Sequence, residues 1–321
     1  MTILSELERP ALPVNHHDAF ARLLKRCEGL APVVCAIAHP CDHDSLLGPI
    51  EAAKRGIIDP VLIGPEAKIR AAAAEAGVDL APWRIVPTEH SHESAARAVA
   101  MARSGEAEAL MKGSLHTDEL MGAVVPSATG LRTARRISHV FALDVPAYPR
   151  PLFVTDAAIN IAPDLEGKAD IVRNAIELAH VLGIAEPRVA VLAAVETVNP
   201  KMQSTLDAAA LCKMADRGQI TGGLIDGPLA FDNAISEEAA RIKKIVSPVA
   251  GRADILLAPD LEAGNMVAKQ LQYLAGADSA GIVLGTRVPI VLTSRADSVR
   301  GRLASTALMA LVAAANRPGK A

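Results

Sequence analysis

A serine and an arginine stand side by side where a buried strand near the C-terminus is expected to end. Ser294 and Arg295 follow an apolar run, and an Ala- and Leu-rich stretch, residues 299–315, comes after them. This order predicts a strand, a turn and a helix, which Asp297 or Ser298 can cap. Ligands of open α/β sheets bind beyond the carboxyl ends of the strands, and a guanidinium group suits phosphate or carboxylate. The pair therefore indicates either an anion site or a capped turn with a solvated arginine.

Other polar residues follow other expected strands in the same way. They are Lys112, Asp156, Glu196, Asp226 and Asn265. The chain has neither the G-x-S-x-G elbow of an α/β-hydrolase nor the G-x-x-x-x-G-K-[ST] loop of a P-loop NTPase, and it has no pair of histidines spaced to bind a metal. The set suits an enzyme that holds a phosphorylated or carboxylated substrate without a metal.

The densest basic cluster lies just before an expected strand. Arg132, Arg135 and Arg136 fall within five residues, and the first two are spaced to share one side of a turn. The cluster is either a solvated face or a phosphate site. The turn that begins at Lys112 and Gly113 has two similar interpretations, an anion cradle or a purely structural turn.

The bulk composition argues against several classes of function. Half of the 321 residues are hydrophobic but only 2% are aromatic, so platforms for stacking nucleic-acid bases are not expected. The net charge of −3 provides no basic field for nucleic acid, and the four cysteines form no C-x-x-C pair of a zinc site. No apolar run reaches the ~18 residues of a membrane span, and residues 1–15 lack a basic region followed by an apolar one. We therefore expect a cytoplasmic protein without a metal and without membrane or nucleic-acid partners.

The hydrophobic pattern predicts the elements that position these residues. The expected strands are residues 32–39, 60–63, 83–86, 109–112, 140–145, 151–155, 188–194, 220–225, 254–258, 281–284 and 289–293. Helical patterns separate most of them, which predicts a doubly wound α/β fold with a parallel sheet and helices on both faces. At ~100–200 residues per domain, the length fits two α/β domains of similar architecture.

Several segments resemble the phosphate acetyltransferase/phosphate butyryltransferase family. They are residues 131–140, 153–163, 193–202, 226–234, 264–266 and 293–298. The wording VNPKM, DGPLAFDNAISEEAA and TSRADS is most similar to the butyryltransferase branch and to the acyltransferase half of proteins fused to an enoyl-CoA hydratase domain. The segments keep the family's order along the chain, so together they are more specific than any one of them.

The resemblance implies the reaction acyl-CoA + phosphate ⇌ acyl phosphate + CoA, with a short acyl group. Coenzyme A is then a substrate, and no permanently bound cofactor is implied. It also implies an isocitrate dehydrogenase-like fold in which a cleft separates two α/β domains, and a homodimer. The C-terminal segment of such proteins returns to the first domain. We therefore expect a first domain of residues 1–140 and 289–321, and a second domain of residues 141–288.

The resemblance also implies catalytic roles. Arg295 matches the family's active-site arginine, which binds phosphate and stabilises the oxyanion through which the transfer passes. Ser294 would orient the CoA thiol or stabilise the intermediate. An aspartate proposed as base in the acetyltransferase branch falls at Gly301 here, so Asp297, the nearest carboxylate, is the substitute candidate.

Six polar residues are candidates for substrate binding: Arg132, Arg135, Lys112, Asn265, Asp226 and Asn199. The two arginines suit inorganic phosphate or the phosphates of CoA, whereas a cap or turn role is the alternative for the last three. Two other functions stay open for the chain as a whole. One is a non-catalytic acyl-CoA-binding protein on the same scaffold, and the other is a metal- and NAD-dependent decarboxylating dehydrogenase that shares the fold.

Overall fold

Strands and helices alternate along most of the chain. The computed structural model describes residues 19–292 and 297–317. The strands are β1 (Val33–Ala38), β2 (Ile58–Gly64), β3 (Arg84–Pro87), β4 (Ala109–Lys112), β5 (Ser138–Asp144), β6 (Leu152–Thr155), β7 (Arg188–Leu192), β8 (Leu224–Leu229), β9 (Ile255–Leu257), β10 (Asp278–Leu284) and β11 (Ile290–Val291). The helices are α1 (Ala19–Cys27), α2 (His43–Lys54), α3 (Glu66–Glu75), α4 (Ser91–Ser104), α5 (Thr117–Val124), α6 (Leu165–Val181), α7 (Gln203–Asp216), α8 (Phe231–Ile235), α9 (Glu237–Ile242), α10 (Leu261–Tyr273) and α11 (Val299–Ala315).

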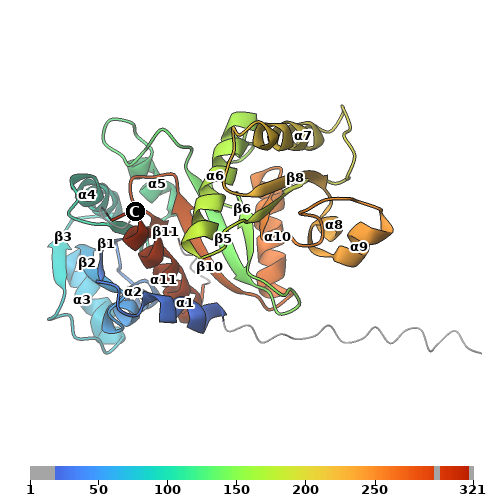
Figure 1. Ribbon diagram of the computed structural model, residues 1–321. Helices are drawn as coiled ribbons and strands as arrows, with labels where there is room; N and C mark the ends of the chain where they lie inside the picture. The colour runs from blue at the N-terminus through green and yellow to red at the C-terminus, as the bar shows by residue number, and fades with distance from the viewer. Residues whose placement is uncertain (1–18, 293–296, 318–321) are drawn as a thin grey trace, which may run out of the picture.

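In the described part of the chain, eleven strands form one sheet in the order β3-β2-β1-β4-β11-β10-β5-β6-β9-β7-β8. The first half of the chain lies on one side of the molecule and the second half on the other, with helices on both faces (Figure 1). α11 returns to the first half and packs against α1, α2 and β10. The predicted α/β class is confirmed.

The sheet is not parallel throughout, and the sequence prediction is wrong on this point. β3, β2, β1, β4 and β11 run parallel to one another, and so do β6, β9, β7 and β8. Between these sets, β10 is antiparallel to both β11 and β5, and β5 is antiparallel to β6. The connections 145–151 and 285–289 are too short for the crossover that parallel pairing requires. The carboxyl ends of the two parallel sets therefore point in opposite directions and not toward one shared edge.

One strand begins later than the sequence pattern predicts. β8 starts at Leu224 and contains Asp226, Gly227 and Pro228, which were expected to follow a strand ending at residue 225. Proline and glycine usually interrupt a strand, but β8 is the last strand of the sheet, and an edge strand tolerates a residue that cannot donate a ladder hydrogen bond. Two short helices, α8 and then α9, follow β8.

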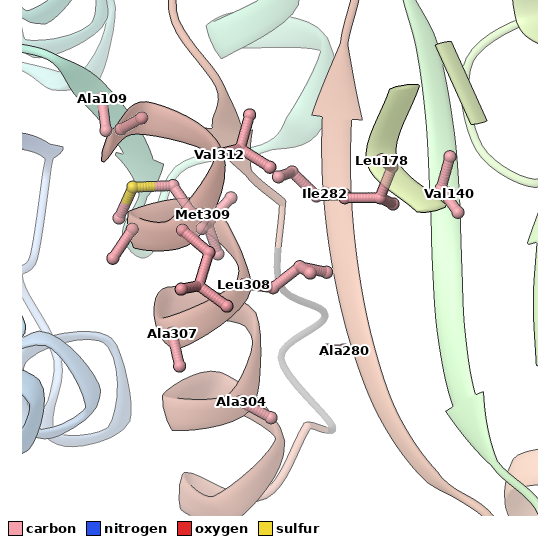
Figure 2. Close-up of a cluster of buried hydrophobic side chains, with 14 of the residues drawn as sticks. Ala109, Val140, Leu178, Ala280, Ile282, Ala304, Ala307, Leu308, Met309 and Val312 are labelled. Carbon is pink, nitrogen blue, oxygen red and sulfur yellow. The ribbon is translucent and has the colours of Figure 1, made fainter. Parts of the chain in front are cut away.

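The C-terminal helix α11 links the two halves of the core. It is buried from Arg302 to Ala314, as expected for a helix with apolar residues on every side. Leu308 and Val312 face Ile282 of β10, while Met309 lies on the side of β4 (Figure 2). Ser298 caps the helix by accepting a hydrogen bond from the Gly301 amide at 3.1 Å, which confirms one of the two predicted caps.

Three further observations concern the helix lengths, the possible metal ligands and the cysteines. Within the described ranges, no helix has both the length and the apolar character needed to cross a membrane. No group of three or more histidine, cysteine, aspartate or glutamate side chains gathers there in a metal-binding arrangement. All four cysteines are free thiols.

Candidate active site

Two of the three predicted catalytic residues, Ser294 and Arg295, lie outside the described residues. The third, Asp297, is half-buried and precedes the cap of α11. Its main-chain oxygen accepts a hydrogen bond from Nε of Arg302 at 3.3 Å. The described part of the site is therefore formed by the residues around the end of β11 and the start of α11.

A pocket of about 460 Å³ opens beyond the ends of β1 and β4. We call it the Lys112 pocket, and its walls include Lys112, Ser114, Arg302, Glu75 and residues 42–45 at the start of α2. Lys112 is only 6% exposed. β4 pairs with β11 in parallel, so this pocket lies at the edge of the sheet where β11 also ends.

Close backbone packing fixes the floor of the Lys112 pocket. A Cβ atom at Gly113 would lie 2.4 Å from the main-chain oxygen of His39, so only glycine fits between the ends of β1 and β4. Ser114 Oγ donates to the same oxygen at 2.9 Å. His39 itself adopts a left-handed conformation with φ of 60°. The turn predicted as either an anion cradle or a structural turn is thus rigid.

The three arginines of the basic cluster differ in their contacts. Arg135 forms an ion pair with Glu177 at 2.8 Å, and the Arg136 Nε donates to Asn160 at 3.0 Å. Arg132 is exposed at a second pocket of about 460 Å³, and no described residue forms a hydrogen bond or ion pair with its guanidinium group. Of the two arginines predicted to bind substrate, Arg132 is therefore better placed than Arg135 to contact an anionic ligand.

Three other substrate-binding candidates have hydrogen-bond partners among the described residues. Asp226 accepts from the next amide, that of Gly227, at 2.9 Å, and the Asn199 side chain accepts from the Lys201 amide at 2.9 Å. Asn265 donates to the main-chain oxygen of Ala157 at 3.0 Å and so joins α10 to the turn after β6. The first two contacts are those of turn residues, and the third is a contact between elements. None of the three lines the Lys112 pocket.

Comparison with known proteins decides the family. The family profile described as phosphate acetyl/butaryl transferase matches residues 88–310. A phosphate acetyltransferase of Rhizobium meliloti is 65% identical over 308 residues, which is 96% of each chain. A phosphate butyryltransferase of Clostridium acetobutylicum is 45% identical and covers 87% of this chain and 92% of its own. The chain belongs to the phosphate acetyl/butyryltransferase family.

The fold of this chain is similar to that of a solved phosphotransacylase structure. A branched-chain phosphotransacylase from Enterococcus faecalis superposes with a TM-score of 0.77 at 31% identity, covering 88% of this chain and 99% of that one. The chain is thus an acyltransferase with two α/β domains, as the sequence predicts. Relatives named for acetyl and for butyryl transfer both occur at high identity, so the resemblance to the butyryltransferase branch alone does not decide the acyl group.

The matched region of the family contains a buried acidic turn. The Asp156 carboxylate, which is 2% exposed, accepts from the amides of Ala158, Ile159 and Asn160 at 2.9, 3.1 and 3.1 Å. The Asn160 side chain donates to it as well and reaches the main-chain oxygen of Ile137. Asp156 therefore organises the turn after β6 and joins it to the start of β5.

A buried histidine was not selected from the sequence, although it lies in a segment that matches the family. His139 on β5 is 1% exposed, and its Nδ1 has no hydrogen-bond partner among the described residues. Burial lowers the pKa of His139 to about 4, although the charges of Asp156 and Asp297 oppose that shift. A Cβ atom at Gly281 would lie 2.9 Å from its Nε2, so the absent side chain of Gly281 leaves room for the ring. The negative charge of Asp297, which precedes α11, thus acts on the pKa of a residue in β5.

Arg302 is another residue that sequence reasoning missed. It lies in the first turn of α11 and is 6% exposed, yet it lines the Lys112 pocket. Its position four residues after the cap Ser298 was a usable signal, because that turn directly follows the Ser294–Arg295 pair of the family.

Proposed function

We propose that this acyltransferase moves a short acyl group, acetyl or butyryl, between CoA and inorganic phosphate. The observation that carries the proposal is the family match over residues 88–310, a range that includes the Ser294–Arg295 pair. CoA acts as a substrate in this reaction, and the proposal includes no permanently bound cofactor. The described residues at the end of β4 and the start of α11 form a pocket with two buried cationic side chains, which suits anionic substrates.

The proposed chemistry is oxyanion stabilisation. Phosphate attacks the thioester carbonyl and the CoA thiolate leaves, or the CoA thiolate attacks the acyl phosphate and phosphate leaves. In both directions the carbonyl oxygen is negatively charged before the leaving group departs. Preorganised donors at that oxygen usually contribute the largest part of catalysis. We assign this role to Arg295, with Ser294 orienting the thiol or sharing in the stabilisation.

A general base is not required in the direction that forms acyl phosphate, because phosphate is already anionic. In the other direction the thiolate is the nucleophile, and a simple thiol such as that of free cysteine, with a pKa of about 8.5, is ionised to a small fraction near neutral pH. The family's proposed base position is Gly301, whose amide serves the cap of α11. Asp297 is the substitute base in this proposal.

The substrate-binding part of the proposal gives most weight to Lys112 and Arg132. Lys112 lines the pocket beside β11, and Arg132 lines the second pocket with its charge available. Arg135, Asn265, Asp226 and Asn199 already make the contacts described above, so we propose supporting roles for them at the margins of the site.

The proposal extends to the organisation of the protein. The division into residues 1–140 with 289–321 and residues 141–288 is supported by the pairing of β11 with β4 and of β10 with β5. The isocitrate dehydrogenase-like cleft, the homodimer and a cytoplasmic location are further parts of it, and they follow from the family resemblance and the sequence. Size-exclusion chromatography with light scattering tests the dimer.

The decisive experiment measures release of free thiol from acetyl-, propionyl- and butyryl-CoA with and without inorganic phosphate. Release that requires phosphate, with acyl phosphate as the product, is the expected result. The order of kcat/KM among the three substrates identifies the preferred acyl chain, because a pocket discriminates by ~1–3 kcal/mol per methylene. Release that is independent of phosphate would identify a thioesterase and contradict the proposal.

A non-catalytic acyl-CoA-binding protein is the second candidate. Gly301 favours it, because the carboxylate proposed as base in the acetyltransferase branch is missing at that position. This candidate predicts that calorimetry detects binding of acyl-CoA while no thiol is released at any phosphate concentration.

A further inference from the structure

A pocket of about 260 Å³ lies beside α1, and none of the substrate-site candidates lines it. We call it the α1 pocket. Helices α1 and α11, the strands β5, β6 and β10, and the end of α6 form its walls. None of its lining residues also lines the Lys112 pocket or the pocket beside Arg132. The α1 pocket is therefore separate from the described parts of the proposed substrate site.

Small and apolar side chains leave the space of the α1 pocket open. Ala142 of β5 is paired with Ala280 of β10 on one side and with Phe153 of β6 on the other. Ala304 and Leu308 of α11 face β10 near Ala280 (Figure 2). Protein interiors are packed so closely that voids larger than a water molecule are few. A space of this size between carbon-rich walls therefore indicates a pocket for an apolar group.

Arg300 holds one end of the α1 pocket in place. Its guanidinium carbon lies 4.0 Å from the centroid of the Phe20 ring of α1, within the range of a cation–π contact. Its Nε and Nη2 atoms also donate to the Asp278 carboxylate at 3.1 and 2.9 Å. Phe20 and Asp278 both line the pocket, so this contact ties α1 to the start of β10. Asp278 thus faces the pocket with a cationic partner already bound to it.

The α1 side of the pocket mouth carries two more arginines. Arg22 and Arg26 are exposed, line the pocket and stand four residues apart, which places them on the same side of the helix. No carboxylate among the described residues forms an ion pair with either of them. Arg26 donates to the main-chain oxygen of Val181, which carries no net charge. Asp144, also at the pocket, accepts from the Ala19 amide at 3.1 Å, so this side of the mouth offers two guanidinium groups to a ligand.

We propose that the α1 pocket binds a small organic anion with an apolar body, of the class of the medium-chain carboxylates. The apolar body fills the carbon-lined space, and the carboxylate pairs with Arg22 and Arg26, whose planar groups suit it. An apolar cavity of about 150 Å³ is large enough for benzene, so the larger α1 pocket suits a chain of about eight carbons. The inference does not depend on the proposed reaction, because binding can be measured without catalysis.

The first test is calorimetric titration of octanoate into the full chain. We expect one molecule of octanoate to bind per chain. Octanol has the same chain without the charge, and acetate has the charge without the chain. Each should bind at least about tenfold more weakly, as for the loss of a hydrogen bond to a charged group or of several buried methylene groups. No binding of octanoate, or equal binding of octanoate and either control compound, would overturn the proposal.

Three variants locate the binding site. Ala142→Leu fills the pocket from β5 and should abolish measurable binding. Arg22→Gln removes one charge at the mouth and should weaken binding about threefold or more, as for an ion pair that water partly screens. Lys25→Gln is the matched control, because Lys25 is an exposed cation of the same helix that does not line the pocket, and its affinity should change less than about twofold. Unchanged affinity in folded Ala142→Leu would show that octanoate binds elsewhere and overturn the proposal.

Methyl NMR of the wild type locates the ligand if Ala142→Leu does not fold. Octanoate should shift the methyl signals of Ala142, Ala280 and Ala304, and leave that of Ala98 in α4, which lies outside the pocket, unchanged. Shifts confined to methyl groups outside the pocket would overturn the proposal. An affinity that falls as the protein concentration rises would show that a second copy of the chain covers the pocket, and would overturn it as well. A lack of phosphate-dependent thiol release would overturn only the proposed reaction.

Discussion

Arg317 and Glu108 form a two-pronged ion pair, with Nε to Oε1 at 2.6 Å and Nη2 to Oε2 at 2.9 Å. Arg317 follows the end of α11, and Glu108 precedes β4. The arginine also donates to the main-chain oxygens of Ala31 and Pro32, at the start of β1, at 3.0 Å each. One side chain thus anchors the end of α11 to two strands of the first half.

Arg317→Ala is expected to lower the free energy of unfolding by about 1–3 kcal/mol, because it removes several hydrogen bonds that involve charged groups. Urea denaturation followed by circular dichroism measures the change. Lys213→Ala is the control, because the Lys213–Asp216 pair is more than 60% exposed on both sides and such exposed pairs contribute little to stability. Equal losses for the two variants would show that the Arg317 contacts are not formed in solution.

A second ion pair is buried between α6 and α7. Lys168 Nζ lies 2.6 Å from Asp207 Oδ2, and Gln203 donates to the other carboxylate oxygen at 2.7 Å. Lys168→Met leaves the Asp207 charge buried without its partner, so we expect a loss of about 3–5 kcal/mol in urea denaturation. The double variant Lys168→Met/Asp207→Leu removes both charges and should recover most of that loss. A double variant as unstable as the single one would attribute the effect to packing.

The sequence predicts local features of this fold better than the contacts between distant segments. The cap at Ser298, the helix after it and most strands follow from patterns within a few residues. Strand direction does not, because a buried strand such as β10 has the same apolar pattern whether its neighbours are parallel or antiparallel. The sequence also does not predict that Lys112 and Arg302 line the same pocket, because this depends on the position of β11 beside β4.

Gly113 has no space for a side chain. Gly113→Ala would place a methyl group 2.4 Å from the main-chain oxygen of His39, and the strain is expected to lower stability by about 1–3 kcal/mol. The same distortion displaces the Gly113 oxygen that holds Lys112. Gly122→Ala is the control, because nothing lies within 4 Å of a Cβ there, and alanine in a helix favours stability by up to about 1 kcal/mol. Thermal unfolding of both variants should therefore give shifts of opposite sign.

The titration of His139 makes stability depend on pH. Its pKa is about 4 in the folded protein and 6.5 ordinarily, so between these values the unfolded chain binds a proton that the folded protein does not. The contribution of His139 to the free energy of unfolding is complete above pH 6.5 and decreases as the pH is lowered toward 4. Asp156 and Asp297 oppose the depression of the pKa, and Lys269 adds to it.

His139→Gln removes this titration. Urea denaturation at pH 7.5, 6 and 5 should show a smaller loss of stability on acidification for the variant than for the wild type. The carboxylates titrate in both proteins, so the difference between the two pH profiles isolates the histidine. Parallel profiles would mean that His139 is protonated equally in the folded and unfolded states.

The last prediction concerns Arg295 and Asp297, which precede α11 in the chain. Arg295→Ala is expected to lower kcat about 100-fold or more, the loss typical of removing an oxyanion donor. Asp297→Asn should have a smaller effect. Because Arg302 uses the main-chain oxygen of Asp297, this substitution leaves that contact intact, and any loss reports on the carboxylate alone. Near-normal turnover in a folded Arg295→Ala variant would contradict the role of Arg295. If Asp297→Asn lowers kcat as much as Arg295→Ala does, and most strongly in the acylation of CoA, Asp297 is the general base.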